Sequence, residues 1–224
     1  MLITVVYDND KNPNRKELKS DWGFSALIEG KENVLFDTGT KPRLLSNNMD
    51  ILDIDAGSVD KVVLSHEHGD HIGGLSAVLP DISGYVEVFI PSSFSRGTKI
   101  EIKKMGENVE VIDVDEPVGI TKDIMSTGEL PGKKNEQSLM IRREKGLFVL
   151  TGCAHPGLDN IMERASEFGD IYGVMGGFHG FDKFEIMKDL EQIIPCHCTE
   201  YKKKIRKKFP DEYMSCYVGL KVKA

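Results

Sequence analysis

The chain has 224 residues, 40% of them hydrophobic, and carries a formal net charge of −7 at pH 7. This size fits one domain over residues 1–224, and the acidic balance argues against nucleic acid as a partner. No apolar stretch approaches the roughly 20 residues that cross a bilayer, and no cleavable leader precedes the first strand-like run, so we expect a cytoplasmic protein without membrane contact.

The predicted elements of the first half are mostly strands. Short runs rich in Val, Ile, Leu or Phe, bounded by turn residues, predict strands over residues 2–7, 25–29, 33–36, 61–64, 85–90 and 109–114. Helices are predicted between them over 41–50 and 75–79, the first with Thr40 as its N-cap and Pro42 in its first turn.

The second half alternates strands with helices. A hairpin is predicted from 138–142 and 147–151, and further strands over 171–175, 193–194 and 213–222. Helices are predicted over 158–168, followed by Gly169, over 183–192, and over 199–209 with Thr199 as cap. Such an order is typical of two packed sheets with helices outside, an α/β layered architecture. The most loop-like stretch is 128–135, which we expect near a site.

Four metal-ligating side chains lie within six positions directly after the predicted strand 61–64: His66, His68, Asp70 and His71. Side chains alternate along a strand, so His66 and His68 project to the same side if the extended pattern continues. Three imidazoles and a carboxylate are a ligand set that zinc or iron(II) accepts. Three of the six histidines of the chain fall in this segment, which favours a metal site over a solvated polar loop.

The other three histidines each follow a strand-like run. Because an α/β sheet collects strand ends along one edge, we expect His155 and His197 to be metal ligands, and His179 to be either a ligand or a contact to substrate. Cys153 lies two positions before His155 and faces the same side if the strand persists. It is either a metal-binding thiolate or a buried thiol that packs beside the site.

Three further features have a structural interpretation beside a functional one. Asp37 ends a predicted strand, where we expect it to hydrogen-bond ring nitrogens of ligand histidines, with a simple turn role as the alternative. The four cysteines predict no disulfide framework, and Cys196 and Cys198 lack the partner pair of a zinc knuckle. The lysine-rich run 202–208 predicts a solvated helix face rather than a phosphate site.

The HxHxDH motif at 66–71, together with the FDTG turn at 36–39, resembles the metallo-β-lactamase superfamily. The resemblance implies a four-layer αβ/βα sandwich with a metal pair in the cleft between its two sheets. It assigns His66 and His68 to one metal, and Asp70 and His71 to the other. Segments spread over nearly the whole chain are similar to the branch named for the dihydropterin-methyl-ribofuranosylaminobenzene phosphate synthase of methanopterin biosynthesis: 22–29, 151–157, 176–179 and 195–199.

The chain departs from the superfamily pattern in the second half of the site. The PGHT-like loop that carries a ligand His in most members corresponds here to residues 134–138, which contain no His. Cys153 stands at the bridging position that is usually Asp. We expect His155 to take the place of the missing ligand, and His197 matches the last His of the superfamily.

The resemblance and the ligand set together predict a metal-dependent hydrolase that uses metal-bound hydroxide on a small molecule. The expected substrate is a phosphorylated or ester-containing metabolite, with a pterin-pathway synthase as a specific possibility. Asp70 is expected to orient the hydroxide and His179 to stabilise negative charge on the substrate. The expected cofactor is two divalent ions, zinc first, with manganese or iron as alternatives.

Two other functions remain open at this point. A di-iron redox protein is one, although such proteins usually carry a flavin domain and His68 stands where Glu would favour iron. A non-catalytic metal-binding member of the fold is the other, although the complete HxHxDH motif counts against a decayed site. The sequence makes no prediction of oligomeric state.

Overall fold

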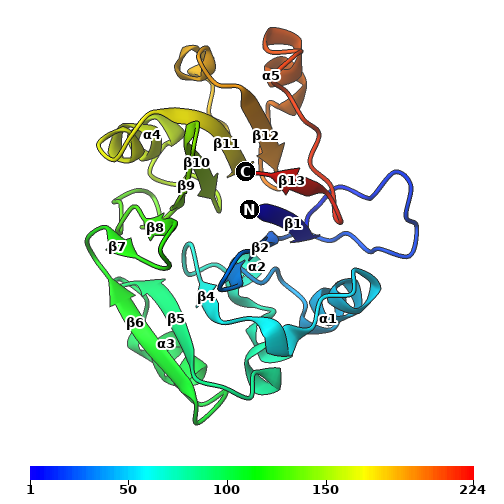
Figure 1. Cartoon of the computed structure of the whole chain (residues 1–224), viewed down its shortest axis with the longest axis vertical. Helices are drawn as coiled ribbons and strands as arrows, with labels where there is room; N and C mark the ends of the chain where they lie inside the picture. The colour runs from blue at the N-terminus through cyan, green and yellow to red at the C-terminus, as the bar shows by residue number, and fades with distance from the viewer.

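The computed structural model describes residues 1–224, and two mixed β-sheets form its framework (Figure 1). The first sheet has the strand order β13-β1-β2-β3-β4-β5-β6, and the second the order β12-β11-β10-β9-β8-β7. The strands of the first sheet are β1 (Leu2–Tyr7), β2 (Ser25–Glu29), β3 (Val34–Phe36), β4 (Lys61–Val63), β5 (Val86–Pro91), β6 (Val109–Val114) and β13 (Lys221–Lys223). Those of the second are β7 (Val118–Gly119), β8 (Ile124–Ser126), β9 (Leu139–Arg143), β10 (Gly146–Thr151), β11 (Ile171–Gly177) and β12 (Gln192–Cys196).

Helices cover the outer face of each sheet. The α-helices are α1 (Pro42–Ile51), α2 (Gly69–Ile72), α3 (Arg96–Lys103), α4 (Leu158–Ser166) and α5 (Lys202–Lys208). Four short 3₁₀ helices complete the set: η1 (Ala56–Ser58), η2 (Leu75–Ala77), η3 (Leu79–Asp81) and η4 (Phe184–Met187). In Figure 1, α1 and α3 lie with the first sheet, and α4 and α5 with the second. No helix has both the length and the apolar character needed to span a membrane.

Successive side chains of a strand point to opposite faces of its sheet, and in this way the apolar residues of the strands form three buried clusters. In β1, Ile3 and Val5 face the cluster between the two sheets, whereas Val6 faces the cluster beneath α1 and α3. A third cluster lies between the second sheet and α4 and α5, and includes Val149 and Ile161. Each such fully buried side chain contributes about 1.5–3 kcal/mol. The result is helix, sheet, sheet, helix, so the predicted four-layer αβ/βα sandwich is confirmed.

Parallel pairing brings the carboxyl ends of several strands to common edges. In the first sheet β3 pairs in parallel with β4, in the register Leu35 to Val62. In the second sheet β10, β11 and β12 are parallel neighbours, in the register Val149 to Val174 to Ile193. The segments that follow these strands carry the candidate ligands, so the topology decides which of them meet.

Some predicted elements are wrong in detail, and the reasons are local. The first helix begins at Pro42 with Lys41 as N-cap, because the Thr40 hydroxyl donates to the carbonyl of Trp22 instead. The predicted helix 183–192 is only η4, since Gln192 is already drawn into β12 beside Gly173. Thr199 does not cap α5, because its hydroxyl oxygen accepts a hydrogen bond from the Phe178 amide.

Other differences concern short elements of weak sequence pattern. Within the predicted strand 213–222 only the end belongs to a strand, β13, which pairs with β1 through Ile3 and Val222. The two chain ends therefore lie side by side in the centre of Figure 1. The short helix α2, helix α3 and strands β7 and β8 were not predicted, and α2 begins inside the HxHxDH motif.

Candidate metal centre

All six histidines of the chain meet in one cluster between the facing strand ends. Each imidazole ring has another within 5.0 Å, measured between ring centroids. The rings come from the segment after β4 (His66, His68, His71) and from the segments after β10, β11 and β12 (His155, His179, His197). The structure therefore brings together every candidate ligand that the sequence indicated.

A first group consists of His66, His68 and His155. One ring nitrogen of each lies within 4.8 Å of those of the other two. His66 Nε2 lies 3.0 Å from His68 Nδ1. His155 Nε2 is buried and has no hydrogen-bond partner. The three rings thus direct nitrogen atoms at one small volume from two different sheets.

A second group consists of Asp70, His71, Cys153 and His197. His71 Nε2 lies 3.2 Å from Cys153 Sγ and 3.7 Å from Asp70 Oδ2. His197 Nε2 lies 3.2 Å from Asp70 Oδ2 and, like His155 Nε2, is buried without a hydrogen bond. Cys153 Sγ also lies within 4.8 Å of ring nitrogens of both His66 and His71, so the thiol stands between the two groups.

This donor set fits divalent metal ions. A buried polar atom without a partner costs about 1–3 kcal/mol, and two imidazole nitrogens here have none. Nitrogen, carboxylate and thiolate donors suit zinc or iron rather than magnesium or calcium. Burial lowers the pKa of His155 to about 4 and lowers that of His66 as well. Both rings are therefore neutral at neutral pH, the form that binds metal.

Asp37 holds the first-sheet side of the cluster in place, as expected from the sequence. Its carboxylate accepts hydrogen bonds from the Ser65 amide and hydroxyl, both at 2.7 Å, and lies 2.7 Å from His71 Nδ1. Burial opposes protonation of His71, but the Asp37 carboxylate raises the pKa of this ring. Occupation of Nδ1 by Asp37 leaves Nε2 to face Asp70 and Cys153.

Asn9 and Asp8 hold His197 in the same way, and sequence reasoning missed both. Asn9 Oδ1 lies 2.9 Å from His197 Nδ1, and Asp8 Oδ2 accepts a 2.8 Å hydrogen bond from the His197 amide. These contacts support a backbone conformation with φ of +43° at His197, which a non-glycine residue rarely adopts. The available signal was a pair of polar residues at the end of the first predicted strand.

Glu136 occupies the stretch that replaces the PGHT-like loop, and its carboxylate organises the loop after β10. Its Oε1 accepts hydrogen bonds from the amides of residues 152–154 at 2.9–3.1 Å and from the Thr151 hydroxyl at 3.0 Å. Its Oε2 accepts one from the His155 amide at 2.9 Å. In place of a ligand histidine, the chain has a buried carboxylate that fixes the backbone beneath Cys153 and His155.

Two more residues that the sequence did not single out touch the second group. The indole Nε1 of Trp22 donates a 2.7 Å hydrogen bond to Asp70 Oδ2. Burial opposes ionisation of Asp70, but the adjacent His197 ring and the nearby His71 ring hold the pKa of this carboxyl well below its usual range. Cys198 Sγ lies 3.3 Å from Cys153 Sγ, and the contact between these two side chains lowers the pKa of Cys198.

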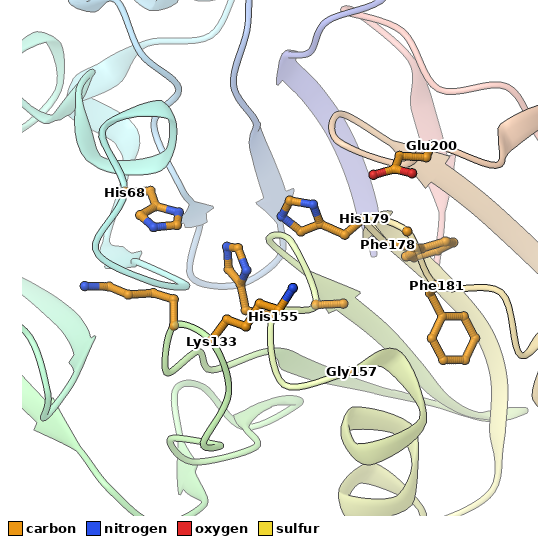
Figure 2. A pocket seen from close by; sticks show the side chains of 11 residues that line it. His68, Lys133, His155, Gly157, Phe178, His179, Phe181 and Glu200 are labelled. Carbon is orange, nitrogen blue, oxygen red and sulfur yellow. The ribbon is translucent and has the colours of Figure 1, made fainter.

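A cavity of about 570 Å³ opens beside the first group. His68, His155 and His179 form one wall, as Figure 2 shows, and their rings face the same space. Apolar walls come from Phe178 and Phe181. Polar groups complete the lining, among them Lys133, Lys134 and Glu200. A small molecule in this cavity lies next to the imidazoles, which is the arrangement of a substrate site beside a metal centre.

A sandwich of two sheets with a histidine- and carboxylate-rich cluster between facing strand ends defines a class of metal-dependent hydrolases. Residues 23–84 match the family model of the metallo-β-lactamase superfamily. The chain is also 30% identical over 239 residues to the uncharacterized protein MJ0448 of Methanocaldococcus jannaschii, covering 90% of this chain and 91% of that protein. The chain belongs to the metallo-β-lactamase superfamily, whose members are mostly metal-dependent hydrolases.

Other similar proteins point in the same direction. The 7,8-dihydropterin-6-methyl-4-(beta-D-ribofuranosyl)-aminobenzene-5'-phosphate synthase of M. jannaschii is 26% identical over 267 residues, covering 91% of this chain and 90% of the synthase. The crystal structure of Tm1679, a metal-dependent hydrolase of the β-lactamase superfamily, superposes with a TM-score of 0.77 at 28% identity, covering 100% and 99% of the two chains. Zn²⁺-bound PqqB from Methylobacterium extorquens shares the fold at a TM-score of 0.66 and 10% identity, covering 100% of each chain.

Proposed function

We propose that this protein is a metal-dependent hydrolase acting on a small phosphorylated or ester-containing metabolite. One observation carries the proposal: six imidazoles, a carboxylate and a thiol converge beside a cavity, and two of the buried ring nitrogens have no partner. Solvated polar loops do not bury donors in this way. The membership of the superfamily supports the same conclusion independently.

The two groups of residues would hold one ion each. His66, His68 and His155 would bind the first, and Asp70, His71 and His197 the second, with Cys153 between them. When bound, divalent ions lower the pKa of a coordinated water from about 15.7 toward 7 and polarise the substrate oxygen. We propose zinc as the metal, because imidazole, carboxylate and thiolate suit it.

Asp70 would orient the attacking water, and His179 would stabilise negative charge on the substrate. Asp70 Oδ2 is fixed by the Trp22 indole and by its proximity to His197, so its carboxylate has a defined orientation toward the centre. A carboxylate held in this way would accept a hydrogen bond from the attacking water and keep it aligned. His179 lines the cavity with a ring centroid 4.6 Å from that of His155, where it can donate a hydrogen bond to a substrate oxygen that gains negative charge.

The substrate class is proposed from similarity as well as from the cavity. The synthase of M. jannaschii named above supports a reaction in pterin metabolism, and phosphorylated pterins therefore belong among the first compounds to test. A cavity of about 570 Å³ with apolar and cationic walls accommodates a molecule of that size. No contact in the site favours di-iron redox chemistry over hydrolysis.

Elemental analysis combined with a substrate panel tests the proposal. The panel contains phosphodiesters, lactones, thioesters and pterin phosphates, and the variants are His68→Ala and Asp70→Ala. The exposed Asp189, whose only ion pair is with Lys188, gives a matched control as Asp189→Ala. We expect zinc and hydrolysis in the wild type and in the control, and a loss of both in the two site variants. Full metal content and activity in both site variants would refute the proposal, and iron with oxygen consumption would favour the redox alternative.

A further inference from the structure

We infer that Lys133 is the anion-binding residue of the cavity, and that the substrate carries a carboxylate or phosphate in addition to the bond that is cleaved. This inference rests on the proposed function, because it takes the cavity beside the imidazoles as the substrate site. It assigns a specificity role to the loop 128–135, which supplies none of the candidate metal ligands.

Close backbone packing places Lys133 at the site. Gly132, the residue before it, lies directly against the loop that carries His155: a Cβ atom at Gly132 would stand 2.6 Å from the His155 carbonyl oxygen and 2.7 Å from Pro156 N. A bridge between Leu130 and Glu136 closes the base of the loop. The glycine thus allows an approach that no other residue permits, and Lys133 emerges beside the metal-binding segment. Figure 2 shows its side chain next to His155 at the edge of the cavity.

Lys133 and Lys134 differ in their ion pairing. Lys134 forms an ion pair with Glu67 at 3.3 Å, and Glu67 also accepts hydrogen bonds from the Ser95 amide and the Thr98 hydroxyl. Lys133 has no carboxylate partner, although the chain as a whole carries a net charge of −7 and many of its surface lysines are paired. An unpaired ammonium in the lining of a cavity is available to an anionic ligand.

The charge on the other side of the cavity sets the orientation of such a ligand. Glu200 lines the cavity across from Lys133 and follows β12, with its amide hydrogen-bonded to the His179 carbonyl oxygen at 3.0 Å. Like charges repel, so an anionic group is excluded from the Glu200 end and drawn to the Lys133 end. Phe178 and Phe181 offer an apolar surface to the body of the ligand. The substrate therefore has an apolar body and an anionic group directed toward the loop 128–135.

Calorimetric titration with small probes measures this binding without any turnover. Phenylphosphonate and phenylacetate supply the two anionic groups on an apolar ring, and dimethyl phenylphosphonate is their neutral counterpart. The protein is used as purified, in the wild type and in Lys133→Gln, Lys133→Glu and Glu200→Gln. Lys133→Gln should raise the Kd of the preferred anion about tenfold, and Lys133→Glu should raise it further. Glu200→Gln should lower it, and the neutral probe should not distinguish wild type from Lys133→Gln.

Lys103 provides the matched control, since it is an exposed lysine on α3 and makes no ion pair. Lys103→Glu changes the net charge as Lys133→Glu does, and should leave the Kd of each probe unchanged. Equal affinity of both anions for wild type and Lys133→Glu would overturn the inference, as would equal losses in the Lys103 variant. Failure of the substrate panel with retained Lys133-dependent binding would count against the hydrolase proposal alone.

Discussion

The substitution Glu136→Gln gives a sharp test of how the loop after β10 is held. Glu136 accepts five hydrogen bonds, four through Oε1 and one through Oε2. A glutamine keeps an acceptor at the Oε1 position, but turns the Oε2 position into an NH₂ group that faces the His155 amide. The His155 amide is left unpaired at a cost of about 1–3 kcal/mol, and the new buried NH₂ group brings further donors to the same place, so this cost is a minimum. Glu136→Leu leaves five donors unpaired, and the summed cost of more than about 5 kcal/mol is comparable with the whole stability of a domain.

Urea unfolding followed by circular dichroism measures the first cost, and elemental analysis shows whether the candidate metal centre survives. We expect Glu136→Gln to fold with a free energy of unfolding lowered by at least about 1–3 kcal/mol and with a reduced metal content, because the His155 backbone loses its hydrogen bond to Oε2. Glu144→Gln, on the exposed turn between β9 and β10, is the control. Wild-type stability and full metal content in Glu136→Gln would refute the reasoning.

Three further expectations follow from the geometry of the site. Asn9→Leu removes the contact to His197 Nδ1 and should weaken metal binding about 10–100-fold by competition with a chelating dye, whereas Asn9→Asp, which keeps an acceptor, should retain tight binding. Gly132→Ala introduces the 2.6 Å clash with the His155 carbonyl and should lower hydrolysis in the substrate panel, while a matched Gly84→Ala, with open space around its Cβ position, should not. Removal of metal by a chelator should lower Tm by roughly 5–11 °C if the ion had been present at about a hundred times its Kd, and an unchanged Tm would show that the cluster binds none.

The part of the site that lies close together in the sequence was predictable. His66, His68, Asp70 and His71 stand within six positions, and the bend at 66–67 followed by helix α2 keeps them in one place although the extended pattern after β4 does not continue. The recurrence of histidine after strands of the second half indicated the rest of the cluster, because parallel strands end at a common edge. The order of predicted strands and helices indicated two packed sheets with helices outside, and the superfamily resemblance added the αβ/βα order of the layers and the cleft between the sheets as the place of the site.

The supporting contacts were not predictable, because they join segments far apart in the chain. Asn9 and His197 are separated by 188 positions, and neither local sequence indicates a contact with the other. From the sequence, the segment that contains Glu136 only lacks the histidine expected there. The folded loop shows that the Glu136 carboxylate accepts hydrogen bonds from five donors. The prediction of a helix over 183–192 was wrong for the same reason, a contact between distant segments. Gln192 pairs with Gly173 in the sheet, and this pairing overrides the helical pattern of the sequence.

Trp22 gives this protein an intrinsic optical probe of its own centre. It is the only tryptophan of the chain, it is 56% exposed, and its indole N–H binds Asp70, one of the candidate ligands. An ion that drew the Asp70 carboxylate toward itself would alter this hydrogen bond, and the emission of a single fluorophore would change with it. Stopped-flow fluorescence of the unlabelled protein can therefore resolve the filling of the second group of residues from that of the first, one ion at a time.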